Sequence, residues 1–483
     1  MKTNLIGLLM LLLIVGPVLA DPGRAVAAEP EPLALTDYPR PLSDTGMGLH
    51  WFPVSGGWTR EQVDFYVGEM RQMGISWVKL LAGAGPQPEV DYLVTKLVEN
   101  EMMPIIRLAG RSDENNGDMS SFVHHYVSLG ARYFEFFNEP AVDEPNTPLS
   151  AVMDRWMARA RETQRAGGIP ILTSLFPSAD LNDNRSYDAA LRYLKEQGAE
   201  GIFRKGAGIA VHNYTLNHPL AYPDDPVQQM GQPLSSTEAA RFGIDEDRRE
   251  EINRRRAADK RPGTTVDQDP WGFRMFETME NRFVRTFGFP VPVIGTEGGA
   301  TVGEVDPRYP KVDETLQAEM TIKIAEYMQT KAPAYYFVSM NWLIGNAVMG
   351  QPALPTWEDQ AWYRTDRQMP VVAELKNWMA EHAPANPRPA PGSSEIVPAA
   401  DGQSSQSAAQ TPMQGLPFQH NQEGSVAPVP LVLASYDGKG VITLINVGGA
   451  AAWVVWREAS LLLRPGAVGQ LDLFTGELAL ISS

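Results

Sequence analysis

The sequence predicts an α/β protein whose main domain is a TIM-type (β/α)8 barrel, followed by a linker and a small C-terminal β module. Strand-like and helix-like segments alternate eight times between residues 46 and 382, which is the size and order of such a barrel. A doubly wound sheet would show a Gly-rich phosphate turn after its first strand, and residues 50–58 match that fingerprint poorly. The chain has 483 residues, 43% of them hydrophobic, and can bury one large core and a smaller one.

The first 20 residues have the pattern of a cleaved secretory signal peptide. Lys2 precedes an apolar run that is interrupted by Pro17 and ends in small residues, so cleavage is expected after Ala20 or after Ala27. A membrane anchor is the alternative, but the run is short and broken for a stable span. The sequence contains no cysteine, which excludes disulfides and thiolate metal sites. We therefore expect a secreted or periplasmic protein without stable membrane insertion.

The elements of the barrel follow in regular order. The first helix has Thr59 as its expected N-cap and Gly74 as its stop. Strands are expected at 46–52, 76–82, 103–109, 132–137, 170–176, 208–214, 291–296 and 334–342. Helices are expected after them at 59–74, 89–101, 120–130, 149–168, 186–198, 273–288, 313–330 and 369–382.

Three segments do not fit the barrel repeat. Residues 215–270 form a connection far longer than the usual two to six residues, which indicates a lid or a cleft wall. Residues 383–427 are rich in Pro, Ser and Gln and are typical of a linker. Residues 428–483 contain β-branched runs separated by turn signals, so we expect a small β module there.

The charge of the chain limits its partners. The formal net charge is −17, which gives no net attraction to phosphate backbones or anionic lipids. Nucleic acid is therefore not an expected partner, and the sequence indicates no oligomeric state.

The stretch YFEFFNEP, residues 133–140, places one carboxylate inside an apolar strand and another at its end. Barrel strands are buried on both faces, so Glu135 is expected to point into the barrel interior, where it serves as a buried support. Side chains alternate along a strand, so Glu139 should share that direction and emerge at the C-terminal mouth. Barrel enzymes hold their reacting groups at that mouth.

Strand seven, within VPVIGTEGG, supplies a second carboxylate. By the same alternation Val293, Gly295 and Glu297 should share one side, with Glu297 at the end of the strand. Glu139 and Glu297 would then face each other across the opening. Glycoside hydrolysis needs such a pair, one group to protonate the departing oxygen and one to attack the anomeric carbon or activate water.

The motifs FEFFNEP and VIGTEGG resemble those of clan A glycoside hydrolases, which carry catalytic glutamates at the ends of strands four and seven. The first is similar to the Glu-x-Trp-Asn-Glu-Pro version of families 5 and 39, with Phe137 in the position of the Trp. The resemblance covers residues 46–382 and neither the linker nor the tail. It does not assign a numbered family or a substrate.

The resemblance implies roles for particular residues. Glu139 would be the acid/base and Glu297 the nucleophile of a retaining hydrolase that needs no metal or organic cofactor. The substrate-binding residues would be Asn138 at the sugar 2-hydroxyl, His212 and Tyr214 beside the nucleophile, and Trp342 as an aromatic floor. Arg107 is a further candidate for the site from the residues themselves, either as a support for the nucleophile or as part of the core. The substrate would be an oligo- or polysaccharide with O-glycosidic, β-linked bonds.

The chain departs from the family 5 pattern at strands two and three. Arg and His are usual there, whereas this chain has Lys79 and Arg107, so we expect a buried network of Lys79, Arg107 and Glu135. Two alternatives use the same fold. One is an inactive barrel that acts as a secreted glycan-binding protein, and the other is a transglycosylase with the same residues.

Overall fold

The structure is a computed structural model. It describes residues 31–382, apart from residues 86, 113, 115–116, 179–182, 349–350 and 353–354, and six strands between Val432 and Ser482. The proposed signal peptide and linker lie outside the described residues. No helix in the part of the chain that is described is long and apolar enough to cross a membrane.

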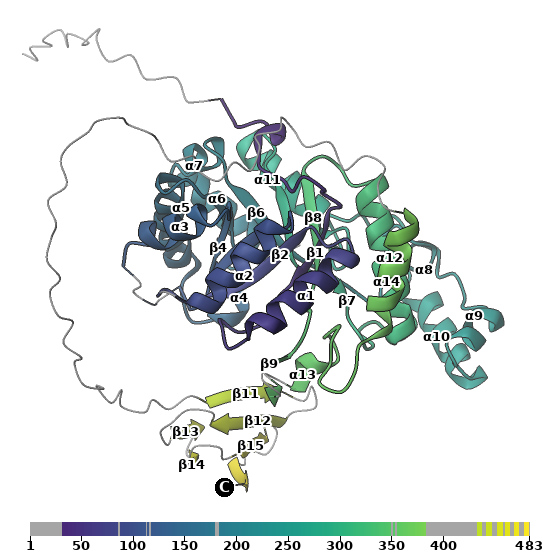
Figure 1. Cartoon of the computed structure of the whole chain (residues 1–483). Coiled ribbons are helices and arrows are strands. Elements are labelled where there is room, and N and C mark those ends of the chain that lie inside the picture. The colour runs from purple at the N-terminus through teal and green to yellow at the C-terminus, as the bar shows by residue number, and fades with distance from the viewer. Residues whose placement is uncertain are drawn as a thin grey trace, which may run out of the picture. The chain divides into compact units, whose positions relative to one another are not determined.

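Eight parallel strands close into a barrel, which confirms the predicted fold class (Figure 1). Each strand pairs with its neighbours in chain order, and the last pairs with the first. The strands are β1 (Met47–His50), β2 (Trp77–Ala82), β3 (Met103–Leu108), β4 (Tyr133–Phe136), β5 (Ile169–Leu172), β6 (Gly208–Leu216), β7 (Val293–Ala300) and β8 (Tyr336–Asn341). The fifth strand is shorter than predicted, and the seventh runs four residues further.

Helices surround this barrel and connect its strands. Thr59 caps the first of them with a capping box to Gln62, as its sequence predicts. The main helices are α1 (Arg60–Gln72), α2 (Pro88–Glu99), α3 (Ser120–Ser128), α5 (Leu149–Arg165), α6 (Tyr187–Glu196), α11 (Met275–Phe287), α12 (Glu314–Thr330) and α14 (Pro370–His382). Short elements are η1 (Leu35–Asp37), α4 (Pro140–Asp143), α7 (Glu200–Arg204), α13 (Pro355–Glu358), β9 (Ala347–Val348) and β10 (Gln351–Pro352).

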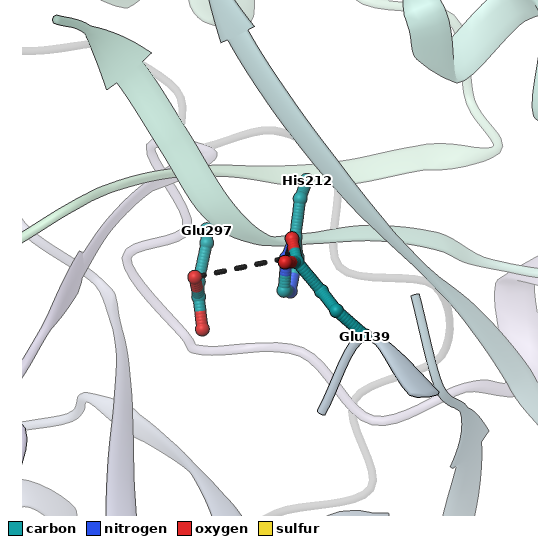
Figure 2. Close-up of side chains that lie close together, drawn as sticks. All are labelled: Glu139, His212 and Glu297. Atoms are coloured by element: carbon teal, nitrogen blue, oxygen red, sulfur yellow. Dashed lines mark hydrogen bonds and ion pairs between the residues drawn. The ribbon is translucent and has the colours of Figure 1, made fainter. Parts of the chain in front are cut away.

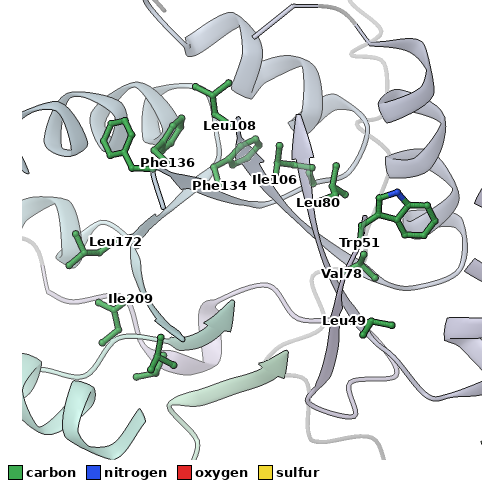
Figure 3. Packing of buried hydrophobic residues seen from close by; sticks show 14 of the residues in the cluster. Leu49, Trp51, Val78, Leu80, Ile106, Leu108, Phe134, Phe136, Leu172 and Ile209 are labelled. Atoms are coloured by element: carbon green, nitrogen blue, oxygen red, sulfur yellow. The ribbon is translucent and has the colours of Figure 1, made fainter. Parts of the chain in front are cut away.

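Alternation along the strands separates two apolar layers. Outward-facing side chains such as Val78, Ile106 and Phe134 pack between the barrel and its helices (Figure 3). Their neighbours Trp77, Ile105 and Tyr133 belong to a second cluster that fills the barrel interior. Further members of the interior cluster include Met103, Ile171, Ala210, Ile294, Val338 and Met340. Above this layer the inward-facing residues become polar, which is where the candidate site begins.

The long connection after β6 contains three helices. They are α8 (Pro226–Met230), α9 (Ser236–Arg241) and α10 (Glu246–Asp259). Leu234, Ala239 and Ile252 form a small buried cluster of their own there. The insertion is therefore an ordered helical addition to the barrel.

The tail forms strands, as predicted for the small β module. These strands belong to a second compact unit of the chain. They are β11 (Val432–Tyr436), β12 (Val441–Asn446), β13 (Ala452–Trp456), β14 (Ala459–Leu463), β15 (Val468–Asp472) and β16 (Leu478–Ser482). Four of them make one antiparallel sheet in the order β11-β12-β15-β16, and β13 pairs with β14.

Candidate active site

Glu135 lies inside the barrel, as its place in an apolar strand predicts. Its side chain is fully buried, and its carboxylate is 2.8 Å from Lys79 Nζ and accepts a hydrogen bond of 3.2 Å from the Thr296 hydroxyl. The sequence also predicts Arg107 in this network. Arg107 is the strand neighbour of Glu135, but its guanidinium extends to Asn138 and Glu297 instead. Lys79 thus bridges Glu135 and Glu297, and Arg107 joins this network through Glu297 and not through Glu135 as predicted.

Glu139 reaches the mouth by a different route from the one predicted. Strand β4 ends at Phe136, and Phe137 and Glu139 adopt left-handed backbone conformations with φ of 69° and 31°. The alternation argument that linked Glu139 to Glu135 is therefore wrong, because it holds only while the chain remains extended. Left-handed conformations are costly for residues other than glycine and occur at functional sites where the surroundings hold them in place.

The short helix α4 begins directly after Glu139 and fixes its backbone. The carbonyl of Glu139 accepts bonds from the amides of Val142 and Asp143, at 2.7 and 2.9 Å. Arg185 holds both ends of α4, because its guanidinium donates to the carbonyls of Pro140 at 2.7 Å and Glu144 at 2.9 Å. The orientation of Glu139 therefore depends on a loop from the next βα unit.

Glu297 also faces the interior for a reason that alternation did not supply. Val293 packs in the outer layer and Ile294 in the interior layer, so Val293, Gly295 and Glu297 do not share a side by simple parity. The register between β6 and β7 shifts at this point: Val211 pairs with Gly295, and His212 pairs with Glu297. The extra residue is Thr296, which also points inward, toward Glu135. This β-bulge turns two successive side chains into the barrel.

The structure brings Glu139, His212 and Glu297 together from three separate segments, and their side chains point toward one another (Figure 2). One carboxylate oxygen of Glu139, one of Glu297 and one ring nitrogen of His212 all lie within 4.8 Å of one another. His212 Nδ1 is 2.5 Å from Glu139 Oε1 and 3.6 Å from Glu297 Oε2. The two carboxylates are therefore close enough to act on one small group.

Glu297 lies among positive charges and hydrogen-bond donors. Lys79 Nζ is 3.1 Å and Arg107 Nη1 is 3.6 Å from Oε1, while the Tyr214 hydroxyl donates to Oε2 at 3.1 Å. Burial alone would raise the pKa of Glu297, but the nearby charges of His212, Lys79 and Arg107 outweigh it and lower this pKa well below the usual range. Glu297 is accordingly ionised at neutral pH.

Burial shapes two neighbouring side chains as well. Burial, helped by the adjacent Lys79, lowers the pKa of His50 to about 3, so its imidazole is neutral at neutral pH. Burial raises the pKa of the Tyr214 hydroxyl, and the negative charges of Glu297 and Glu139 raise it further. This hydroxyl therefore stays protonated and can donate a hydrogen bond. The ionised Glu297 thus has an uncharged donor on one side and cations on the other.

Asn138 lies between the cationic residues and α4. Its side-chain oxygen accepts a bond of 2.8 Å from Arg107, and its amide donates to Asp143 at 2.9 Å. Trp342 follows β8 and is partly buried, with its ring 4.4 Å from the ring of His50 and 5.5 Å from that of Trp357, measured between centroids. Of the residues that the sequence predicts for the site, Asn138, Glu139 and Trp342 thus follow β4 and β8, whereas Arg107, His212, Tyr214 and Glu297 lie within β3, β6 and β7.

Two residues near Glu297 were not among the predicted site residues, although Lys79 was expected in a buried network with Arg107 and Glu135. His50 is buried at the end of β1, and Lys79 contacts Glu297 directly in addition to Glu135. Both have a detectable signal, since each is a polar residue at an inward-facing position of an otherwise apolar strand. The contact between Lys79 and Glu297 could not be predicted, because it depends on the β-bulge that turns the Glu297 side chain into the barrel.

The donor atoms of Glu139, His212 and Glu297 have a spacing that would suit a metal ion. The surroundings do not favour one, since Lys79 and Arg107 already neutralise Glu297 and would repel a second cation. The arrangement fits acid–base and nucleophilic chemistry by the side chains themselves.

Neither a known protein family nor a curated protein sequence matches this chain. Solved structures that match include a family 39 glycoside hydrolase from Bacteroides cellulosilyticus WH2, with 11% identity, a TM-score of 0.42, and coverage of 93% of this chain and 82% of that one. A glucosidase from Croceicoccus marinus matches with 12% identity, a TM-score of 0.39, and coverage of 90% and 82%.

A family 128 endo-β-1,3-glucanase from Sorangium cellulosum matches with 13% identity, a TM-score of 0.37, and coverage of 68% and 97%. These values are too low to assign a family or an activity. The function is therefore inferred from the site alone.

Proposed function

We propose that this protein is a retaining glycoside hydrolase in which Glu297 is the nucleophile and Glu139 the acid/base. The observation that carries the proposal is the spacing of the two carboxylates at the barrel mouth, with oxygens within 4.8 Å. Retaining glycosidases hold their carboxyl groups about 5–5.5 Å apart, whereas inverting ones need about 6.5–9.5 Å to admit a water.

The electrostatics favour this assignment of roles over the reverse. A nucleophile must be ionised, and Lys79, Arg107 and Tyr214 stabilise negative charge on Glu297. Among the described residues, no lysine or arginine forms an ion pair with Glu139. Its carboxylate contacts His212 instead, and histidine is a residue able to carry a proton.

The first half-reaction transfers the sugar to Glu297. The carboxylate attacks the anomeric carbon, the bond to the leaving-group oxygen breaks, and Glu139 gives its proton to that oxygen. In the second half, water attacks the anomeric carbon and Glu139 takes the proton from it. The bond to Glu297 then breaks, and the product leaves with its original configuration.

The remaining residues of the site would orient the sugar. Asn138 presents its amide beside Glu139, at a point where it could bind the hydroxyl next to the anomeric carbon. Trp342 is partly exposed at the end of β8 and could stack on the apolar face of a sugar ring. We infer that the substrate is an oligo- or polysaccharide with β-linked bonds.

The test is turnover of aryl β-glycosides and β-linked polysaccharides by the purified protein. Glu297→Ala should abolish turnover, and added azide should rescue it by forming a glycosyl azide of inverted configuration. Glu139→Ala should instead remain active on substrates with good leaving groups, and azide should give a product of retained configuration. Glu196→Ala removes an exposed glutamate on α6 and is the matched control.

Two results would refute the proposal. The first is that Glu297→Ala turns over substrate at the rate of the wild type without azide. The second is that NMR shows the wild-type enzyme to release a product of inverted configuration. Products longer than the substrate would instead identify transglycosylation by the same residues.

Export is a separate proposal that rests on the pattern of residues 1–20. Expression of the full chain in a bacterial host should yield protein in the periplasm or medium with a mature N-terminus after residue 20 or 27. An intact N-terminus in the cytoplasm would contradict it.

A further inference from the structure

A cavity of about 450 Å³ lies among the loops that follow β4, β5 and β6. Its lining includes Ala141 from α4, Phe176 and Asp183 from the β5–α6 loop, and Pro270 and Trp271 at the end of the insertion. Loops that follow barrel strands form the catalytic face, so this cavity shares a face with Glu139. Its volume is within the range of small-ligand sites.

The cavity is lined by the short helix that directly follows the acid/base. Ala141 is the second residue after Glu139 in the chain, and α4 begins between them. The described lining residues include none from β7, which carries Glu297. In a glycosidase the proton donor contacts the oxygen of the leaving group, so the rest of the leaving group extends past the donor. A cavity on this side is therefore placed to receive it.

Trp271 supplies an exposed aromatic surface in this cavity. Its side chain is 44% exposed, and its ring is 5.4 Å from that of Phe176 with a tilt of 39° between the planes. The Trp271 carbonyl contacts His218 Nδ1 at 2.8 Å, and the other ring nitrogen of His218 is 3.2 Å from Asp306. These contacts fix the backbone and one side of the ring before any ligand arrives, which lowers the entropic cost of binding.

The polar groups of the cavity suit an uncharged sugar. Ser178, Asp183 and Gln268 offer hydroxyl, carboxylate and amide groups, which are the partners that sugar hydroxyls use. Arg185 is the cation in the lining, and its guanidinium already binds the carbonyls of Pro140, Glu144 and Thr147. A carboxylate-bearing sugar would meet Asp183, and the described lining offers it no cation other than Arg185.

We propose that this cavity is the binding site for the leaving-group sugar, with an uncharged pyranose ring stacked on Trp271. The inference rests on the proposed glycosidase function and adds that the leaving group of the substrate is an uncharged sugar. A sugar on the acid/base side is then part of what the enzyme recognises.

The experiment compares two sets of substrates, matched so that each pair transfers the same sugar to the enzyme and differs in the leaving group. One set is cellotriose, laminaritriose, mannotriose and xylotriose, and the other is the matching glycosyl fluorides, whose leaving group is too small to occupy the cavity. Trp271→Ala should lower kcat/KM for the cleaved trisaccharide by about tenfold or more, since it removes the stacking surface, and change the fluoride value by less than about twofold.

Trp271→Phe keeps an aromatic ring and should retain most of the trisaccharide activity. Phe65→Ala removes an exposed aromatic residue from α1, outside this cavity, and should leave kcat/KM for both sets of substrates unchanged. Circular dichroism and thermal unfolding establish that each variant is folded.

Equal losses on both substrates, or no loss on either, would overturn the assignment of the cavity. Wild-type cleavage of a fluoride but of no trisaccharide would overturn the substrate class and leave the proposed function standing. Failure of the wild type on both sets and on aryl glycosides and polysaccharides would refute the proposed function itself.

Discussion

Replacing Lys79 with Met should damage both the stability and the chemistry of this protein. Lys79 is fully buried, and its ammonium lies 2.8 Å from Glu135 and 3.1 Å from Glu297. At an effective dielectric constant of about 20, each contact corresponds to roughly 5–6 kcal/mol of Coulomb attraction, which offsets a desolvation cost of several kcal/mol per ion. In the variant, Glu135 and Glu297 still bear the cost of desolvation but no longer gain the Coulomb attraction to the Lys79 ammonium.

We therefore expect Lys79→Met to lower the free energy of unfolding by about 3–5 kcal/mol, the usual cost of breaking a buried ion pair. Urea unfolding of the full chain measures it. Lys79→Met combined with Glu135→Gln should cost less than the sum of the two single variants, because the second change removes the charge that the first left unpaired. Additive costs in this cycle would show that the pair is not coupled.

The same variant should change the pH dependence of activity. In the folded protein the pKa of Glu297 is lowered, so its ionised form stabilises the fold above the pH at which an unfolded glutamate titrates, and this contribution is lost as pH falls through the folded pKa. Without Lys79 the pKa of Glu297 rises, because burial still raises it and one cation fewer opposes this.

The acidic limb of the kcat/KM profile should then move to higher pH in the variant. An unfolding cost below about 1 kcal/mol together with an unchanged acidic limb would refute the role given to Lys79.

Three further variants test the remaining contacts. Tyr214→Phe removes the hydroxyl that donates to Glu297 and should lower kcat about tenfold with little change in thermal unfolding; an unchanged kcat would contradict this. His212→Ala should slow the hydrolysis of substrates with poor leaving groups more than of those with good ones, because it removes the contact that holds the acid/base Glu139. An equal loss of rate across a series of aryl glycosides would contradict this. Arg185→Gln removes the donors that hold α4 and should reduce kcat more than it changes KM, whereas a loss confined to KM would place Arg185 in substrate binding.

The barrel was predictable because its signals are local. Alternating apolar strands and amphipathic helices repeat eight times, and the cap at Thr59 and the stop at Gly74 can be read from a few neighbouring residues. The inward direction of Glu135 was predictable for the same kind of reason, since a carboxylate in a strand buried on both faces has to point to the interior. These inferences use only the sequence within one element.

The prediction failed where the backbone departs from regular strands. Alternation placed Glu139 and Glu297 at the mouth, but the structure reaches both positions by irregularities, the left-handed residues after β4 and the bulge in β7. The same bulge brings Glu297 to Lys79, a contact that the sequence did not indicate. A one-residue change of register reverses the facing of a side chain, so agreement on the final position did not make the reasoning correct.

The sequence by itself determined the closed barrel and the inward direction of Glu135, because periodicity and burial are properties of each segment alone. Only the tertiary structure decided which cations surround Glu297, how Arg185 holds α4, and that Trp271 from the insertion shares a cavity with Ala141 beside Glu139. Those relations join residues far apart in the chain, and their distances are set by strand register and loop packing, which no local pattern encodes.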